Sequence, residues 1–446
     1  MDEKFDVAII GGGVAGITAY NYLVKRNFKV CLIEARDTLG GRINSFIDKI
    51  TNDEIDNGQH LLIGAYKEFL ELVNDLNSTN FLKKLNHIDF KLYSKNERYY
   101  LKSKLNGKWG YFFAILNLND INILDKLRIV KLFLIIKFLY ANKFVNYSCY
   151  EFLKKYKQSD KIIKIFWEPL IIATLNNNIY DAPAKLLINV LKLGFLSNSQ
   201  NSKLIFSKVG LTKLIEPIEK KNFNNSKIYK STRVKKIINE NNKIISLLLN
   251  NGEYIVANSF ISTVLPNELK KMNLDSNIEQ FNFFDEWEYS SVLSIYLWYD
   301  GDIFDFDFIG VIDSPIHWIF NRREIFEDQN LAYPNLISII ISSANELINL
   351  SNSEILDLVR EEILNILPDI KNRNLLHFRI IKEKFATFKI DKSVEKSRPN
   401  NNTNFSNLFI AGDWTNTDLP ATIESAALSG KKSAIFVENY LYNLKE

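Results

Sequence analysis

Apolar and polar positions over the first 34 residues predict a strand, a helix and a second strand. Residues 5–10 form a β-rich run with few polar positions, which is typical of a strand buried inside a parallel sheet. Residues 17–26 favour a helix, and residues 29–33 form a second apolar strand. The pattern therefore indicates a βαβ unit at the N-terminus.

A glycine-rich turn, Gly11-Gly12-Gly13-Val14-Ala15-Gly16, joins the first strand to the helix. Gly11 permits the tight turn, Gly13 lets a pyrophosphate approach the backbone, and Gly16 lets the helix pack closely on the strand, while Val14 and Ala15 lie between Gly13 and Gly16. Glu34, at the end of the second strand, can accept hydrogen bonds from ribose hydroxyls and disfavours a 2′-phosphate. The unit is predicted to bind a dinucleotide other than NADP. A glycine-rich turn without a ligand is the alternative.

A second glycine pair follows this acid, in the stretch Glu34-Ala35-Arg36-Asp37-Thr38-Leu39-Gly40-Gly41-Arg42. It resembles the Glu-x-Arg-x-x-x-Gly-Gly-Arg signature of FAD enzymes in the amine oxidase and phytoene desaturase superfamily. The resemblance implies that Gly40 and Gly41 close over FAD and that Arg42 lies near its phosphates or its flavin. The alternative for Arg42 is a solvated loop cation. Ala35 and Arg36 join the candidate cofactor residues.

A strand–helix unit near the C-terminus resembles the second FAD motif of the same superfamily. Residues 407–411 predict a short strand, Gly412 and Asp413 end it, and a helix follows Pro420. The resemblance implies that Asp413 holds the ribityl chain or a phosphate of FAD. It also implies that the helix N-terminus, at Ala421 and Thr422, faces the pyrimidine edge of the flavin. Taken alone, the unit could be an ordinary corner with Asp413 as a cap.

Short strands separated by Asn and Gly turns are predicted between residues 226 and 266. They resemble the β-meander and return strand of this fold, in which a valine such as Val234 contacts the adenine. The predicted fold class is α/β, with a Rossmann-like FAD-binding domain of the glutathione-reductase-like, amine oxidase type and an interleaved α+β substrate domain. The expected boundaries are 1–85, 205–266 and 378–446 for the FAD-binding domain, and 86–204 and 267–377 for the substrate domain.

Four further segments are spread over the chain and carry a closer resemblance. Together they resemble the hydroxysqualene dehydroxylases, also described as squalene-associated FAD-dependent desaturases. Phe385 departs from the family pattern, in which this position is commonly Arg. The segments are 56–66, 166–170 with 173–176, 383–388 and 412–426.

This resemblance implies a reduction of hydroxysqualene to squalene by reduced FAD. Because the hydroxyl carbon is allylic, protonation and loss of water followed by hydride transfer is a chemically reasonable route. His60 is the first candidate for the proton donor, and Tyr66 and Glu168 are further candidates. The alternative for His60 is a structural histidine that is hydrogen-bonded to a neighbouring loop. The alternative for Glu168 is a carboxylate that only marks the end of a helix.

Aromatic residues make up 13% of the chain and are candidates for the wall of a channel that takes a C30 hydrocarbon. They include Trp287, Tyr289 and the segments 295–298 and 318–320, for each of which the core of a second sheet is the alternative. Residues 125–144 combine Lys and Arg with Leu, Ile, Phe and Tyr. This mixture suits a helix at a membrane interface, or else a helix buried on two faces.

Composition excludes several classes of protein. The chain has 446 residues, and its net charge of +4 is too small to point to nucleic acid. Two cysteines rule out a disulfide framework and indicate a reducing compartment, and no Cys/His cluster has metal-ligand spacing. With no secretory signal and no run of about 18 apolar residues, we expect a cytoplasmic protein, peripheral on the inner face of the cell membrane if 125–144 is interfacial.

The sequence therefore predicts an FAD-dependent oxidoreductase acting on a long isoprenoid, by reductive dehydroxylation of hydroxysqualene in squalene or hopanoid biosynthesis. A carotenoid or phytoene desaturase, or an amine oxidase, on the same scaffold is the alternative. A non-catalytic lipid carrier is a third reading, which the intact glycine and Gly-Asp motifs disfavour. The expected partners are an apolar isoprenoid, a membrane surface and an unidentified electron donor, because a second dinucleotide motif is absent.

Overall fold

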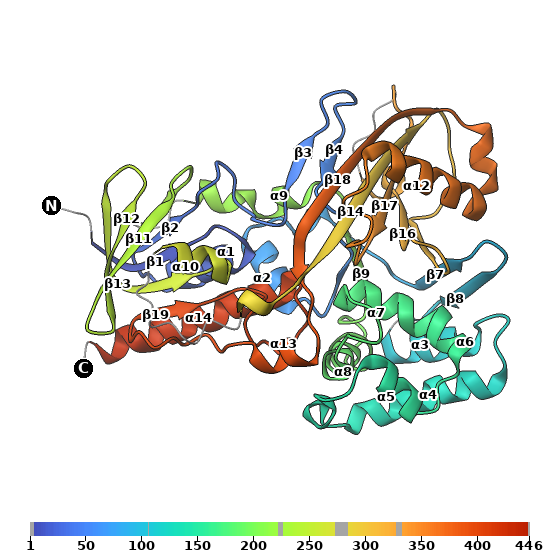
Figure 1. Cartoon of the computed structure of the whole chain (residues 1–446), viewed down its shortest axis with the longest axis horizontal. Helices are drawn as coiled ribbons and strands as arrows, with labels where there is room; N and C mark the ends of the chain where they lie inside the picture. The colour runs from blue at the N-terminus through green and yellow to red at the C-terminus, as the bar shows by residue number, and fades with distance from the viewer. Residues whose placement is uncertain (1–3, 106, 222–225, 273–283, 327–331, 445–446) are drawn as a thin grey trace.

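The computed structural model describes residues 4–105, 107–221, 226–272, 284–326 and 332–444. Two seven-stranded sheets dominate these residues, with a group of helices beside the second sheet (Figure 1). Two smaller sheets connect the parts: β3 (Ser45–Ile47) with β4 (Glu54–Asp56), and β5 (Leu62–Ile63) and β6 (Leu82–Lys84) on either side of β9 (Leu204–Ser207).

The first sheet grows from the N-terminal βαβ unit. Its strands are β1 (Lys4–Ile10), β2 (Val30–Ile33), β10 (Lys227–Tyr229), β11 (Val234–Glu240), β12 (Lys243–Leu249), β13 (Tyr254–Ser262) and β19 (Leu408–Ile410). β1 pairs in parallel with β2 and β13, and β13 pairs in parallel with β19. β11, β12 and β13 form the predicted antiparallel meander. The strands predicted over 5–10, 29–33 and 407–411 are confirmed.

Two helices from opposite ends of the chain pack together against this sheet (Figure 1). They are α1 (Val14–Val24) and α14 (Ile423–Asn443). A Cβ built on Gly430 would lie 2.1 Å from the carbonyl oxygen of Ala15, so only glycine allows this approach. α1 begins earlier than predicted, because Gly13 is its N-cap residue. Around them lie α2 (Lys67–Asp75), α9 (Leu211–Ile215), α10 (Pro266–Lys271) and α13 (Lys392–Ser397).

The second sheet runs in the order β18-β14-β17-β16-β15-β7-β8. The strands are β7 (Ile88–Tyr93), β8 (Arg98–Ser103), β14 (Tyr289–Tyr299), β15 (Phe308–Val311), β16 (Trp318–Asn321), β17 (Asn335–Ile341) and β18 (Leu375–Phe388). α12 (Asn352–Ile366) covers one face, with Ile355, Val359 and Ile363 at helical spacing in the shared core. The expected boundary at residue 378 falls inside β18, which pairs with β14 along its length. The division into two domains stays a prediction.

A group of helices fills most of residues 107–195. They are α3 (Gly107–Leu116), α4 (Ile123–Phe138), α5 (Cys149–Lys155), α6 (Asp160–Ile162), α7 (Glu168–Leu175) and α8 (Ala184–Val190), with π-helical turns η3 (Ile163–Trp167) and η4 (Leu191–Phe195). The helix expected within 125–144 ends at Phe138, because Leu139 is extended. Of the helices in the described ranges, none is both long and apolar enough to cross a bilayer.

Candidate functional site

A cavity of about 2010 Å³ runs from the first sheet to the helices beside the second sheet. Pockets that hold one small ligand measure roughly 300–1,000 Å³, so this cavity has room for a cofactor and a substrate together. The end at the first sheet is lined by backbone and polar side chains, and the other end is lined mainly by apolar side chains. We call them the polar end and the apolar end.

The glycine turn forms one wall of the polar end. Gly11 has a φ of +101°, a conformation that favours glycine, and a Cβ built on Gly16 would lie 2.0 Å from the carbonyl oxygen of Gly11. The Glu34 carboxylate fixes the turn, because it accepts the N–H of Gly12 at 2.7 Å and that of Arg36 at 2.8 Å. Backbone N–H groups at the start of α1 are thereby held toward the cavity.

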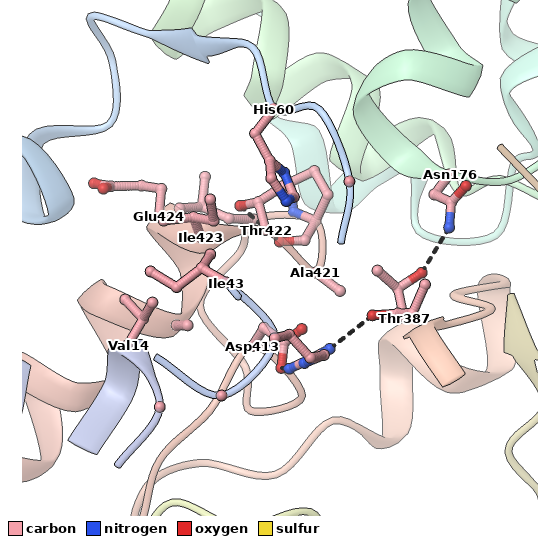
Figure 2. Close-up of a pocket in the computed structure, with 18 of the residues that line it drawn as sticks. Val14, Ile43, His60, Asn176, Thr387, Asp413, Ala421, Thr422, Ile423 and Glu424 are labelled. Atoms are coloured by element: carbon pink, nitrogen blue, oxygen red, sulfur yellow. Dashed lines mark hydrogen bonds and ion pairs between the residues drawn. The ribbon is translucent and has the colours of Figure 1, made fainter. Parts of the chain in front are cut away.

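An ion pair closes the polar end by joining the two sequence motifs. Arg42 donates to Asp413 at 2.5 Å and to the carbonyl oxygen of Ala386 at 3.0 Å. Asp413 is buried, whereas two-fifths of the Arg42 side chain is exposed. Arg42 is therefore a paired cation and not the solvated loop cation of the alternative interpretation. Figure 2 shows Asp413 in the wall of the cavity.

A buried arginine that the sequence analysis missed holds the loop after Gly412. The Arg398 guanidinium donates to the carbonyl oxygens of Asp413 at 2.9 Å and Leu419 at 2.7 Å, and it pairs with Glu395 at 3.0 Å. Lys185 reaches the same carboxylate at 2.8 Å. The shape of the loop therefore depends on a charge network whose arginine lies 15 residues before Asp413 in the chain. No motif in the sequence marks it.

The N-terminus of α14 opens into the cavity. Thr422 caps it by accepting the N–H of Ser425 at 3.2 Å. Glu424, also missed as a functional candidate, lines the cavity and accepts the N–H groups of Glu68 and Phe69, both at 3.0 Å. Burial raises the pKa of Glu424 to about 7, although those two N–H groups oppose the shift. Glu424 thus ties α14 to the start of α2.

Fifteen of the sixteen predicted cofactor residues line this one cavity, and Gly16 does not, because it packs against Gly11 and Thr263. Val234 is buried at the start of β11. The lining members are Gly11, Gly13, Val14, Ala15, Glu34, Ala35, Arg36, Gly40, Gly41, Arg42, Val234, Gly412, Asp413, Ala421 and Thr422.

His60 and Tyr66 lie in the cavity wall between the two ends. Burial lowers the pKa of His60, which the nearby Asp56 carboxylate opposes, and burial raises the pKa of Tyr66 to about 12. Both side chains are thus neutral at neutral pH. His60 is drawn with Ala421 and Thr422 in Figure 2.

The segment that carries His60 is anchored by two arginines that sequence reasoning did not find. Arg322 is fully buried and donates to Asp56 at 3.2 Å and to Gln59 at 2.5 Å. The neighbouring Arg323 pairs with Asp53 at 2.8 Å. The loop that precedes His60 is therefore held at several points.

The apolar end is lined by helices on one side and by the second sheet on the other. Of the aromatic candidates, Trp318 and Phe320 line it. Tyr296 and Trp298 instead belong to a separate core cluster, and Trp287 packs against Phe388. For these three residues the alternative, a place in the core and not in the channel wall, is correct. The wall includes Tyr111, Phe133, Phe166, Leu170, Leu193, Phe195 and Ile340.

Comparison with known proteins shows which family this chain belongs to. Residues 14–435 match the flavin-containing amine oxidoreductases. The chain belongs to this family. Its cofactor is FAD, as the sequence predicts, and it is a flavin-dependent oxidoreductase.

Several known proteins and solved structures are similar to this chain along nearly its whole length. The 15-cis-phytoene desaturase of Solanum lycopersicum is 24% identical, over 98% of this chain and 78% of that protein. The hydroxysqualene dehydroxylase of Sinorhizobium fredii is 23% identical, over 96% of this chain and 97% of that protein. An oxidoreductase from Methanosarcina mazei has a TM-score of 0.74 at 17% identity, covering 96% of this chain and 99% of that one. A redesigned putrescine oxidase has a TM-score of 0.73 at 14% identity, covering 98% and 99%. The predicted amine oxidase-type fold is confirmed.

Within this flavoprotein, Glu168 lies apart from the other catalytic candidates. It does not line the large cavity but a second one of about 200 Å³, behind Pro169 and Trp318. Asn176, which follows the same helix, donates to the Thr387 hydroxyl at 2.9 Å and so ties α7 to β18 (Figure 2).

Proposed function

We propose that this flavoprotein reductively removes the hydroxyl group of hydroxysqualene and releases squalene. The observation that carries the proposal is a single cavity with both dinucleotide motifs at one end and a long apolar wall at the other. An isoprenoid substrate is supported by the relatives, whose names are phytoene desaturase and hydroxysqualene dehydroxylase. The dehydroxylase matches over nearly its whole length, whereas the chain spans 78% of the tomato desaturase.

We infer that the polar end holds FAD. A Cβ built on Gly13 would meet no atom within 4 Å, so this turn leaves open space on the side where a pyrophosphate would lie. The N-termini of α1 and α14 both bring partial positive charge to the cavity. When bound, FAD supplies the hydride. The holding residues are the lining set given above, with Gly16 keeping α1 close to β1.

His60 and Tyr66 are the groups that we assign to the substrate hydroxyl. A neutral imidazole and a neutral phenol can both donate a hydrogen bond, so they can orient the C–O bond between the two ends of the cavity. For proton transfer, the neutral His60 ring first takes up a proton, and the imidazolium then gives this proton to the leaving oxygen and becomes neutral again. His60→Gln should lower turnover by about 100-fold or more. The exposed His87→Gln is the matched control.

We also propose that α3 and α4 present the membrane-facing surface. Leu124, Leu127, Leu134 and Phe138 follow one exposed stripe of α4, and Phe138 is 81% exposed. Trp109 and Phe113 of α3 and Leu193 of η4 are also exposed, and Leu193 lines the apolar end. Lys and Arg side chains interleave with this stripe, as suits a surface of anionic lipids. A water-insoluble substrate would enter beside Leu193. Phe133 faces inward and stacks on Trp167, so α4 is buried on one face and exposed on the other, and the alternative of a helix buried on two faces is wrong.

A phytoene desaturase is the second candidate, favoured by the 24% identity to plant desaturases over nearly all of this chain. Product analysis separates the candidates. Anaerobic incubation of the FAD-loaded, chemically reduced protein with hydroxysqualene should give squalene. Oxidised protein should leave phytoene and a simple amine unchanged. Recovery of unchanged alcohol from protein whose FAD is bound and reduced would refute the proposal, and a desaturated carotene would establish the alternative.

A further inference from the structure

The second cavity adjoins the apolar end of the large one. Pro169 and Trp318 line both, so these two side chains form the partition. Its outer rim carries the ion pair of Lys164 and Asp313, at 2.6 Å, whose side chains are about half exposed. The cavity therefore connects solvent to the back of the partition, and it has room for several water molecules.

Groups that carry protons line the second cavity. Glu168 faces Lys164 from η3 and Asp313 from the loop after β15, and burial raises the pKa of the Glu168 carboxyl. His317 accepts the N–H of Ser342 at its Nδ1 atom, at 3.1 Å, so the proton of the neutral ring is on Nε2.

A short route connects the partition to His60. Trp318 pairs with Ile340 across the sheet, and Ile340 pairs with Ser294, so the three share one face. Trp318 and Ser294 are therefore two strand spacings apart, which is a distance of about 10 Å. A Cβ built on Gly58 would lie 3.6 Å from Oγ of Ser294 and 3.8 Å from Nε2 of His60, so these two atoms flank one point.

Ser294 is unusual for a buried residue. Its side chain is fully buried, and the described part of the chain offers its hydroxyl no hydrogen-bond partner. An unpaired buried hydroxyl costs about 1–3 kcal/mol. A water between Ser294 and His60 would remove this cost.

We propose that the second cavity is the proton inlet and water outlet of the substrate cavity, with Glu168 and His317 in the inlet and Ser294 relaying to His60. This rests on the proposed function, which requires both movements. Each turnover protonates the hydroxyl group, breaks the C–O bond and releases one water. The carbon then receives a hydride from the reduced flavin to form the new C–H bond. One proton enters an apolar cavity and one water leaves it.

Glu168→Gln, His317→Gln and Ser294→Ala test the proposal in the FAD-loaded full chain, with the exposed Glu361→Gln and His87→Gln as controls. One readout is squalene formation as a function of pH, with its solvent deuterium isotope effect. The other needs no isoprenoid: flavin photoreduction takes up a proton, and an indicator dye in unbuffered solution follows the uptake. Both rates should fall at least 10-fold in the three variants and stay within twofold in the controls.

Rates within twofold of wild type in all three variants would refute the inlet. Lys164→Met, at the exposed rim, covers the case in which the buried variants do not fold. Glu168 delivers a proton only while it is protonated, so both rates fall as the pH rises through its pKa. Since Lys164 lowers this pKa, the loss of Lys164 should move the alkaline limb of both pH profiles upward, and an unmoved limb refutes the inlet. If proton uptake is slowed in the variants but the wild-type protein makes no squalene, the inlet is supported and hydroxysqualene is refuted as the substrate.

Discussion

The two ends of the large cavity are built in different ways. The polar end uses backbone N–H groups, glycines and charge pairs that come from two short motifs near the ends of the chain. The apolar end uses side chains scattered over helices and a sheet. A polar ligand needs donors at fixed places, because each unpaired buried group is costly. A hydrocarbon needs only volume and apolar surface. Substitutions that disturb the local structure should therefore impair ligand binding at the polar end, whereas the apolar end should tolerate them.

The largest expected effect tests whether the polar end depends on a remote side chain. Arg398→Met should lower the free energy of unfolding by about 3–5 kcal/mol, because it leaves Glu395 buried and poorly paired. FAD retention should fall with it. Urea unfolding and flavin absorbance measure the two effects. Arg373→Met, at an exposed guanidinium, is the control. If the Arg398→Met protein were as stable and as yellow as wild type, the polar end would not depend on Arg398.

A second test uses the charge state of Glu424. Its folded pKa of about 7 lies above the usual value of 4.5, so the folded state binds more protons than the unfolded state between these pH values. Stability from this group should therefore be complete below pH 4.5 and fall as the pH rises to 7, by up to about 3 kcal/mol. Glu424→Gln should flatten this part of the curve, as thermal unfolding from pH 4 to 8 can measure. A variant with the wild-type slope would show that another group titrates.

Two glycines in the same turn separate folding from cofactor binding. Gly16→Ala places a Cβ 2.0 Å from a backbone oxygen and should cost about 2 kcal/mol or more. Gly13→Ala meets no atom within 4 Å, so the apoprotein should melt as wild type does while its FAD affinity falls. Calorimetry of the apoprotein and FAD titration measure both. Equal FAD affinity in Gly13→Ala and wild type would contradict a close approach at this residue.

The smallest effect on folding is expected at the apolar end. Leu134→Asp with Phe138→Asp should change stability by less than about 0.5 kcal/mol, because both side chains are exposed. Binding to anionic liposomes in co-sedimentation should nevertheless fall about 10-fold or more. Leu364→Asp, on α12, is the matched control. Unchanged liposome binding would remove the membrane-facing role of α4.

The sequence predicts the polar end far better than the apolar end, and the reason is physical. Strand, turn and helix at residues 5–26 are local, and glycine is required at particular positions of the turn, so the motif is visible without a structure. Arg398 and Arg322 act through contacts far along the chain, and no local pattern distinguishes a buried arginine from a surface one. Trp298 and Trp318 look alike in sequence, yet one is in a core and the other lines the cavity. Only tertiary packing separates them.

The bond between Arg42 and Asp413 spans 371 positions of the chain. A ribosome therefore releases one half of the polar end long before it has made the other. The nascent protein cannot complete its grip on the flavin until β19 and α14 have emerged, so cofactor capture belongs to the last moments of synthesis or follows it. Chains that terminate before β19 would lack Asp413 and therefore one side of the polar end.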